Sequence, residues 1–298
     1  MSALQGDLAA LGTSAAWSIG YIFFSIGVRR IGPDNVNRLR LAMAAGILLV
    51  LHSLVYHVPI PLHVELWRLG WLALAGVVGF ILSDAMLFRA LGTLGPQRTS
   101  LVMALVPVAS SLLAWGAFGE TLSLLQIGAI ALVIGGIALV LWRGERACAT
   151  SRHAYLGGIV LAVCSSCAQA SRYVLSKEGM RGGFPILSTN VLQILSATVA
   201  IWILALLQRK AGEAVSSLSD RTGALASLGG AMSGPVVGVT LSLVALVLAP
   251  VGIASTLMAL SPIFLLPLSR LLFKEPIRPR AVLGTLVAMA GVAILFLA

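Results

Sequence analysis

The chain has 298 residues, of which 59% are hydrophobic and only 10% are charged, and its mean hydropathy is +1.01. A soluble domain carries about 25% charged residues, so the composition excludes a soluble globular protein and predicts an integral membrane protein. The net charge of +10 does not indicate a nucleic-acid partner, because the basic residues stand singly between apolar runs and form no single patch.

Ten segments are long and apolar enough to cross a membrane as helices, since a span needs about 20 mostly apolar residues. They lie at 8–28, 37–57, 67–91, 97–118, 122–142, 154–176, 185–207, 223–248, 251–273 and 279–297. The connections between them are short and leave no room for a soluble domain. The N-terminal sequence lacks the basic region of a signal peptide, so we expect the first segment to be retained as a span.

The first span carries polar and aromatic residues at steps of three and four positions, which share one helical face: Ser14, Trp17, Ser18, Tyr21 and Ser25. Two interpretations of this face remain open. A polar face can line a watery cavity, but serine also lets helices approach closely, and tryptophan and tyrosine often lie at the membrane interface. Trp17 and Tyr21 lie near the middle of the span and are candidate substrate-binding residues.

The third span contains Asp84, the acidic residue that lies well inside a predicted span. Asp84 shares a helical face with Phe80, and Ser83 precedes it in the chain. Three roles for the carboxylate remain open: it binds a substrate ammonium, carries a coupling proton, or forms a structural ion pair with Arg89 or Arg172. Phe80, Ser83 and Asp84 are therefore candidate binding residues.

Proline interrupts the fourth and ninth spans at equivalent points, Pro107 and Pro262. Proline kinks a helix, and broken membrane helices often mark a binding site. The neighbouring serines and methionines are candidate binding residues, together with Met232 in the eighth span: Ser100, Met103, Ser255, Met258 and Ser261. Methionine adapts to flat or apolar ligands, although core packing is its commoner role. We also expect hinges at the two prolines and at Gly79, Gly234 and Pro235.

The sixth span places Ser165, Gln169 and Arg172 on one face, with Tyr173 beside them. A guanidinium inside a membrane normally faces protein or water, and its planar fork can bind a substrate carboxylate. The alternative is that Arg172 extends its side chain to the membrane surface, four or five residues away. Gln169, Arg172 and Tyr173 complete the candidate site. Polar residues of the seventh span are expected to form interhelical hydrogen bonds.

An internal repeat is visible at an offset of 155 residues. RTSLVMALVPV at 98–108 aligns with IASTLMALSPI at 253–263, and the alignment continues without a gap to 142, with ten identities in 45 positions. The N-terminal parts of the two halves agree more weakly, at an offset near 151. We therefore expect two five-helix repeats, 1–146 and 147–298.

An odd number of spans in each repeat makes the second copy enter the membrane from the opposite side, so the repeats are expected to be inverted. Sixteen basic residues fall in or near odd-numbered connections and three in even-numbered ones, which predicts odd connections in the cytoplasm and both termini outside. The repeated stretches FGETLSLL (118–125) and FKEPIRPR (273–280) agree with this, because only the second is basic. Their shared glutamates, Glu120 and Glu275, are expected at helix N-termini.

Ten spans, the five-plus-five repeat and the signature S-x-x-M-A-L-x-P with a following Glu in each half resemble the EamA family of the drug/metabolite transporter superfamily. The resemblance extends over nearly the whole chain. Within the family, the sequence is most similar to exporters of aromatic amino acids. The resemblance implies the all-α fold of that superfamily, with ten transmembrane helices around a central cavity, in a bacterial-type inner membrane. It also implies export of small amphipathic metabolites, amino acids and aromatic ones among them, by alternating access.

Two other functions remain open: a flippase for a lipid or polyprenyl carrier, and a membrane-embedded transferase. A transferase needs a constellation of reactive groups that the spans do not supply, and no phosphate-binding loop of an ATP-driven pump is present, so we expect no enzyme and no cofactor. The four histidines stand apart, and no metal site is predicted. The expected partners are a small-molecule substrate, amino acids or related metabolites, and the lipid bilayer. We expect a monomer or a weak homodimer.

Overall fold

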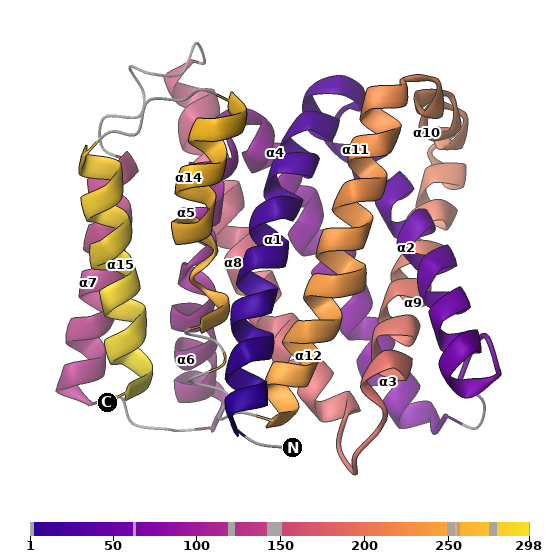
Figure 1. The fold of residues 1–298 in the computed structure, drawn as a ribbon, viewed down its shortest axis with the longest axis horizontal. Coiled ribbons are helices and arrows are strands. Elements are labelled where there is room, and N and C mark those ends of the chain that lie inside the picture. Colours follow the sequence, from indigo (N-terminus) through magenta and orange to yellow (C-terminus); the bar gives the residue numbers. More distant parts are fainter. Residues whose placement is uncertain are drawn as a thin grey trace.

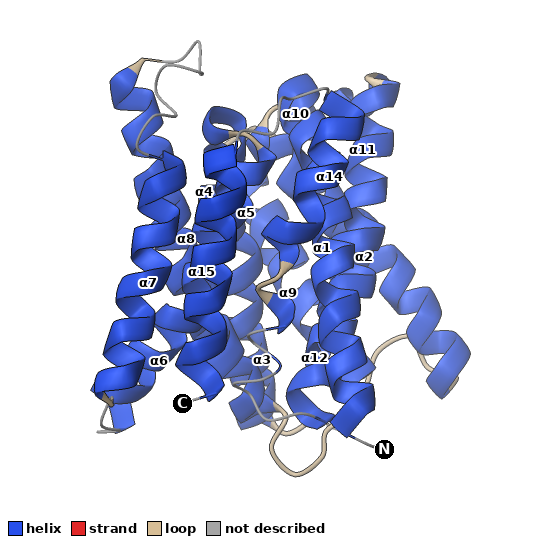
Figure 2. Ribbon diagram, turned by 60° about the vertical axis from the view of Figure 1, so that its left-hand side comes forward, coloured by secondary structure: helices blue, strands red, loops and turns tan. Residues whose placement is uncertain are grey.

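The computed structural model describes residues 3–61, 64–118, 123–141, 151–248, 254, 257–273 and 279–297. Every regular element in these residues is helical (Figure 2). Glu120, Glu275 and the candidate Ser255 lie outside the described residues.

The first half of the chain forms seven α-helices and one π-helical segment, η1, within the described residues. Their bounds are α1 Ala3–Ile31, α2 Pro33–Tyr56, α3 Leu66–Gly76, η1 Val77–Ser83, α4 Asp84–Leu94, α5 Pro96–Met103, α6 Leu105–Phe118 and α7 Leu124–Leu141. Gly32 has a φ of 81° and precedes a proline at the first turn of α2. Glycine accepts this left-handed backbone without strain, and proline suits the first helical turn, so the chain reverses sharply there.

The second half repeats most of this order. Its elements are α8 Arg152–Gly179, α9 Ile186–Leu207, α10 Ala211–Ser216, the 3₁₀ turn η3 Ser217–Ser219, α11 Arg221–Ala231, the π-helical segment η4 Met232–Gly238, α12 Val239–Leu248, α14 Ser261–Phe273 and α15 Pro279–Leu297. The short helix α10 and the turn η3 lie where the sequence predicted only a connection. Asp220 ends this connection, and its side chain accepts a hydrogen bond from the backbone N–H of Gly223 at the start of α11 (2.8 Å).

Seven helical segments of the described chain are long and apolar enough to cross a membrane: Leu4–Ile31, Pro33–Tyr56, Leu66–Leu94, Leu124–Leu141, Arg152–Gly179, Ile186–Leu207 and Arg221–Leu248. Two shorter apolar helices cover Ser261–Leu272 and Pro279–Leu295. Large apolar side chains such as Leu124 and Leu207 stand exposed on the outside of the bundle, as expected for a surface that faces lipid.

Backbone irregularities recur at the offsets that the sequence predicted. The π-helical segments at 77–83 and 232–238 are 155 residues apart. The break between α5 and α6 at Ala104 has its counterpart in the turn at 259–260, just before α14. Pro107 and Pro262 each lie within three residues after such a break. Proline has no N–H, so the carbonyl group one turn earlier has no helical hydrogen bond from it. The two halves therefore share backbone detail as well as sequence.

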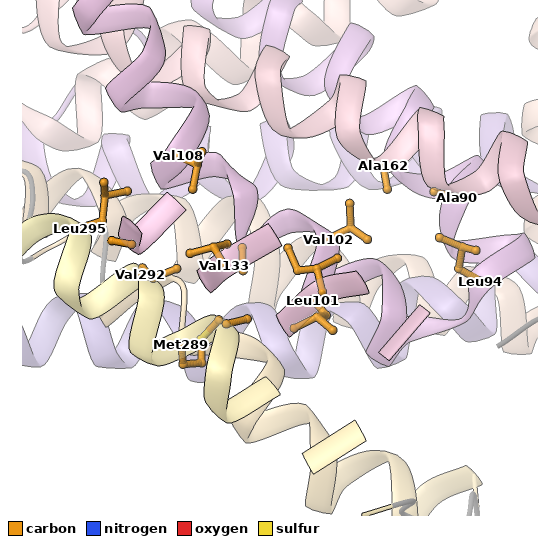
Figure 3. Close-up of a cluster of buried hydrophobic side chains, with 14 of the residues drawn as sticks. Ala90, Leu94, Leu101, Val102, Val108, Val133, Ala162, Met289, Val292 and Leu295 are labelled. Carbon is orange, nitrogen blue, oxygen red and sulfur yellow. The ribbon is translucent and has the colours of Figure 1, made fainter. Parts of the chain in front are cut away.

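The helices α7 and α15 pack side by side at one edge of the bundle (Figures 1 and 2). Gly136 allows this close approach, because a Cβ atom there would lie 2.5 Å from the backbone nitrogen of Ala288. An apolar cluster joins this pair to α4, α5, α6 and α8 (Figure 3), with Val133, Val292 and Leu101 among its buried members.

Candidate functional site

A cavity lies between helices from both halves of the chain and encloses about 910 Å³ of empty space, including the part that is open to solvent. The first half lines it with residues from α1, α2, η1, α4, α5 and α6, and the second half with residues from α8, η4, α12 and α14.

Most of the candidate binding residues predicted from sequence line this cavity: Trp17, Tyr21, Phe80, Asp84, Ser100, Met103, Gln169, Arg172, Tyr173, Met258 and Ser261. The proposed hinge residues Pro107, Gly234, Pro235 and Pro262 also lie in its wall. Trp17 and Tyr21 thus face the interior of the bundle, whereas the serines of the same predicted face, Ser14, Ser18 and Ser25, are buried and are not part of the cavity wall.

Three candidates lie elsewhere. Ser83 is fully buried between η1 and α8, where its hydroxyl donates to the carbonyl oxygen of Ser165 (2.9 Å). Met232 is 42% exposed and is not part of the cavity wall. Gly79 packs against the side chain of Arg172 and does not line the cavity itself. Helical periodicity alone does not separate these positions from the cavity face, because the π-helical segments shift the angular positions of the residues within and after them.

Asp84 forms an ion pair with Arg40 of α2, so the sequence-based pairing with Arg89 or Arg172 is wrong. Arg89 instead pairs with Asp34 near the start of α2 (3.1 Å). Only 3% of the Arg40 side chain and 13% of the Asp84 side chain are exposed. A buried carboxylate and guanidinium at contact distance stabilise each other's charged form.

Arg40 is held by several further contacts. Its Nε and Nη2 atoms donate to Oδ1 of Asn37 (3.0 and 2.8 Å), and Nδ2 of Asn37 donates to the carbonyl oxygen of Phe80 in η1 (3.0 Å). The guanidinium also lies 4.9–5.9 Å from the ring centroids of Phe24, Phe80 and Phe88. Arg40 is thereby fixed between α2, η1 and α4.

Arg172 is also buried, with 1% exposed, but it has fewer partners. Its Nη1 donates to Oε1 of Gln193 in α9 (3.3 Å), and its guanidinium lies 5.0 Å from the ring of Phe80 and 5.1 Å from that of Tyr173. Among the described residues, no acceptor reaches its Nε or Nη2 atom. The side chain therefore does not extend to the membrane surface, which was the alternative that the sequence allowed.

Gly79 permits this position of Arg172. A Cβ atom at residue 79 would lie 1.8 Å from Cδ of Arg172, so any larger residue in η1 would push the guanidinium away. Gln193 is oriented in turn by a hydrogen bond from its Nε2 atom to the hydroxyl of Ser176 (3.0 Å). The expectation that polar residues of the seventh span bond between helices thus holds for Gln193.

The rest of the wall is mainly aromatic, aliphatic and thioether. Trp17, Tyr21 and Phe24 come from α1, Met103 from α5, and Met258 from the helical residues just before the turn at 259–260. Hydrogen bonds between helices hold this region together. The hydroxyl of Ser18 donates to the carbonyl oxygen of Ser261 (2.9 Å), and the hydroxyl of Ser261 donates to the carbonyl oxygen of Ser14 (3.1 Å).

Sequence reasoning missed Phe24 and Arg40, both of which line the cavity. Arg40 is one of the sixteen basic residues that the sequence pattern assigns to odd-numbered connections. The Gly32-Pro33 pair was the signal that could have found it, because proline favours the first helical turn and a helix from Pro33 puts residue 40 two turns inside the span.

In the part of the chain that the structure describes, no group of three or more His, Cys, Asp or Glu side chains comes together to hold a metal ion. The charged residues of the cavity wall are Arg40, Asp84 and Arg172. The described wall contains one ion pair, Asp84 with Arg40, and one further guanidinium, that of Arg172, with two donors that have no acceptor.

The model of the EamA-like transporter family matches the chain twice, at residues 4–142 and 156–297. Among curated proteins, none matches the chain. Solved structures do: 27 chains match, and one of them, described only as the crystal structure of a protein, has a TM-score of 0.70 and 17% sequence identity, with 99% of this chain and 98% of the other covered. At that identity the likeness shows the fold alone.

Proposed function

The chain belongs to the EamA-like transporter family and is a multi-pass membrane protein of the drug/metabolite transporter type, and we propose that it is a secondary exporter of small amphipathic metabolites. Amino acids, aromatic ones among them, are the proposed substrates, and a bacterial-type inner membrane is the proposed location. The cavity carries this proposal, because both repeats contribute to its wall and its aromatic and methionine side chains suit a flat or apolar body.

We propose ten spans arranged as two inverted repeats, 1–146 and 147–298. The recurrence of π-helical segments and helix breaks at an offset of 155 residues supports the repeat. In this count α5 and α6 form one broken span, and α14 and α15 belong to the last two. The start of α1 and the end of α15 lie at the same end of the bundle (Figure 1), as an even number of crossings requires.

Alternating access is the proposed mechanism. Pro107, Gly234, Pro235 and Pro262 lie in the cavity wall, where a wide or broken turn needs little energy to change its backbone angles. Small rotations at these points would open the cavity first to one side of the membrane and then to the other. The substrate would remain in place while the helices around it move.

Counterflow in liposomes tests the proposed function. Purified protein is reconstituted, the vesicles are loaded with one unlabelled amino acid from a broad panel, and uptake of the labelled compound is followed with and without a pH gradient. Protein-free vesicles are the control. We expect uptake of aromatic and other apolar amino acids, and an effect of the gradient would show proton coupling. No movement across the panel, with movement of a lipid-linked substrate instead, would overturn the proposal in favour of a flippase.

A further inference from the structure

The carboxylate in the described wall of the cavity already has a charged partner. Asp84 is paired with Arg40, and Arg40 is held further by Asn37 and by the carbonyl oxygen of Phe80. A substrate ammonium would have to displace a buried guanidinium to reach the carboxylate, and would leave that guanidinium without its charged partner. In the described wall of the cavity no second carboxylate is present.

The positive charge of Arg172, in contrast, is in excess. Two guanidinium groups and one carboxylate line the described wall, and the Arg40 ion pair accounts for the carboxylate. Arg172 is 1% exposed, and its Nε and Nη2 atoms have no acceptor among the described residues. The side chains that it bonds there are neutral, the amide of Gln193 and the hydroxyl of Tyr173. Buried cationic donors without an acceptor are costly, and a carboxylate of the ligand satisfies both in a bidentate manner.

The surroundings of Arg172 suit a flat or apolar group attached to that carboxylate. The rings of Phe80 and Tyr173 lie about 5 Å from its guanidinium carbon. Beyond them the wall continues with Trp17, Tyr21 and Met103, all without formal charge. A ligand with one anionic end and one aromatic or aliphatic end matches this distribution, whereas a second, cationic end finds no acceptor of opposite charge that is free.

We infer that the cavity recognises small organic monocarboxylates: the carboxylate binds Arg172, the aromatic or apolar body lies against the surrounding rings and methionines, and an α-amino group is not recognised. This inference rests on the proposed function, because it takes the cavity to be the substrate site. It narrows that function, since amino acids then bind through their carboxylate and side chain only, and the corresponding acids without an amino group bind at least as well.

Binding of four probes with the same phenylpropyl skeleton tests the inference: 3-phenylpropionate, L-phenylalanine, 3-phenylpropionamide and 3-phenylpropylamine. Dissociation constants are measured by calorimetry on the purified full-length protein in detergent, which avoids leakage of the probes through lipid. We expect the acid to bind about tenfold or more tightly than its neutral amide, as loss of a charge-assisted hydrogen bond predicts. Phenylalanine should bind no more tightly than the acid, and the amine should not bind measurably.

Variants test whether Arg172 causes the preference for the acid over the amide. Arg172→Gln should weaken binding of the acid about tenfold or more and abolish the preference for the acid over the amide. Arg172→Lys keeps the charge but not the planar fork, so the preference should survive with weaker binding. Lys177→Gln is the matched control, because it removes a positive charge from an exposed position on the same helix and should change neither constant.

An amine that binds as tightly as the acid would overturn the inference, and so would phenylalanine that binds tenfold more tightly than the acid. The wild-type series decides even if Arg172→Gln does not fold. If only the proposed export function is wrong, the protein still prefers the acid in detergent but shows no counterflow in liposomes. Absence of binding for all four probes would overturn the inference directly.

Discussion

The two repeats share one backbone feature, a π-helical segment that is held by an asparagine side chain. They differ in the charged residues around it. In the first repeat, Asn37 of α2 donates to the carbonyl oxygen of Phe80 in η1 (3.0 Å). In the second, Asn190 of α9 donates to that of Pro235 in η4 (2.9 Å), the position 155 residues after Phe80. Each π-helical segment is therefore fixed by an asparagine from the neighbouring helix.

The charged residues break this symmetry. Three residues after Asn37 the chain has Arg40, whereas three residues after Asn190 it has the neutral Gln193. Asp84, the partner of Arg40, corresponds to Val239 in the second repeat. The guanidinium of the second repeat comes instead from Arg172 of α8, whose counterpart at an offset of 151 is Tyr21.

This difference separates two roles. The charge of the first repeat is neutralised inside the protein and joins α2 to α4, while the charge of the second repeat keeps free donors next to the cavity. A symmetric pair of repeats would have either two internal ion pairs and no excess charge or two unpaired cations. The excess positive charge of the described cavity wall thus arises from a few residues at positions that are not equivalent in the two halves.

The largest expected effect follows from breaking the ion pair of the first repeat. Arg40→Gln leaves the carboxylate of Asp84 buried without its charged partner, and such a change typically costs about 3–5 kcal/mol. We expect a strong fall in the melting temperature in detergent and poor expression.

The double variant Arg40→Gln with Asp84→Asn is the matched control, because replacing both partners removes the uncompensated charge. It should recover most of the stability. A double variant as unstable as Arg40→Gln alone would show that the contacts of Arg40 with Asn37 and the phenylalanine rings, and not the ion pair, dominate.

Equivalent glycines of the two π-helical segments give the next largest difference. A Cβ atom at Gly79 would lie 1.8 Å from Cδ of Arg172, whereas at Gly234 it would lie 3.2 Å from Cζ of Phe24. Gly79→Ala should therefore destabilise the protein by about 3 kcal/mol and displace the guanidinium, and Gly234→Ala should cost clearly less. Thermal unfolding of both variants measures the difference, and equal losses would contradict the close packing of Arg172 on η1.

Substituting the two asparagines tests the feature that the repeats share, the hydrogen bond from asparagine to the π-helical segment. Asn190→Ala removes hydrogen bonds to the carbonyl oxygen of Pro235 and to Thr240, and we expect a loss of about 1 kcal/mol. Asn37→Ala should cost about 2 kcal/mol, because Arg40 also loses two bonds to the amide oxygen. Unfolding in detergent measures both. A larger loss for Asn190→Ala would contradict the account of the first repeat as the more highly connected one.

The smallest effect is expected at the N-termini of the equivalent helices α3 and α11, where Glu65 and Asp220 are 155 residues apart. The backbone N–H of Gly223 holds the pKa of the Asp220 carboxyl below its usual range, whereas a hydrogen bond from Arg68 lowers the pKa of Glu65. A lowered folded-state pKa stabilises above the unfolded pKa, and the effect is lost as the pH falls through the folded value. Asp220→Ala should therefore lower the melting temperature slightly at neutral pH and not in acid.

Salt distinguishes the two carboxylates. Exposed ion pairs are screened by salt, while a hydrogen bond to a backbone amide persists. The effect of Glu65→Ala, which depends mainly on Arg68, should shrink more at high ionic strength than the effect of Asp220→Ala. Equal loss of both effects would show that Asp220 acts through its ion pair with Arg30 and not as a helix cap.

The sequence predicted the repeat, its offset and most of the cavity face, because these follow from identity at fixed spacing and from helical periodicity. Trp17, Tyr21 and Gln169 were found in this way. The partner of Asp84 was not, since Arg40 lies 44 residues away in the chain and the contact depends on how α2 packs against α4. Ser83 was misplaced for a related reason, because its orientation depends on the wide turn of η1.

The central claim is that the charge of Arg40 is neutralised by Asp84, while the charge of Arg172 binds the carboxylate of the ligand. Dissociation constants of 3-phenylpropionate, measured for three proteins, test it. The proteins are the wild type, Arg172→Gln, and the double variant Arg40→Gln with Asp84→Asn. We predict that Arg172→Gln weakens binding about tenfold or more and that the neutralised pair leaves it within about threefold of wild type. The reverse order, with binding lost in the double variant and kept in Arg172→Gln, would contradict the claim.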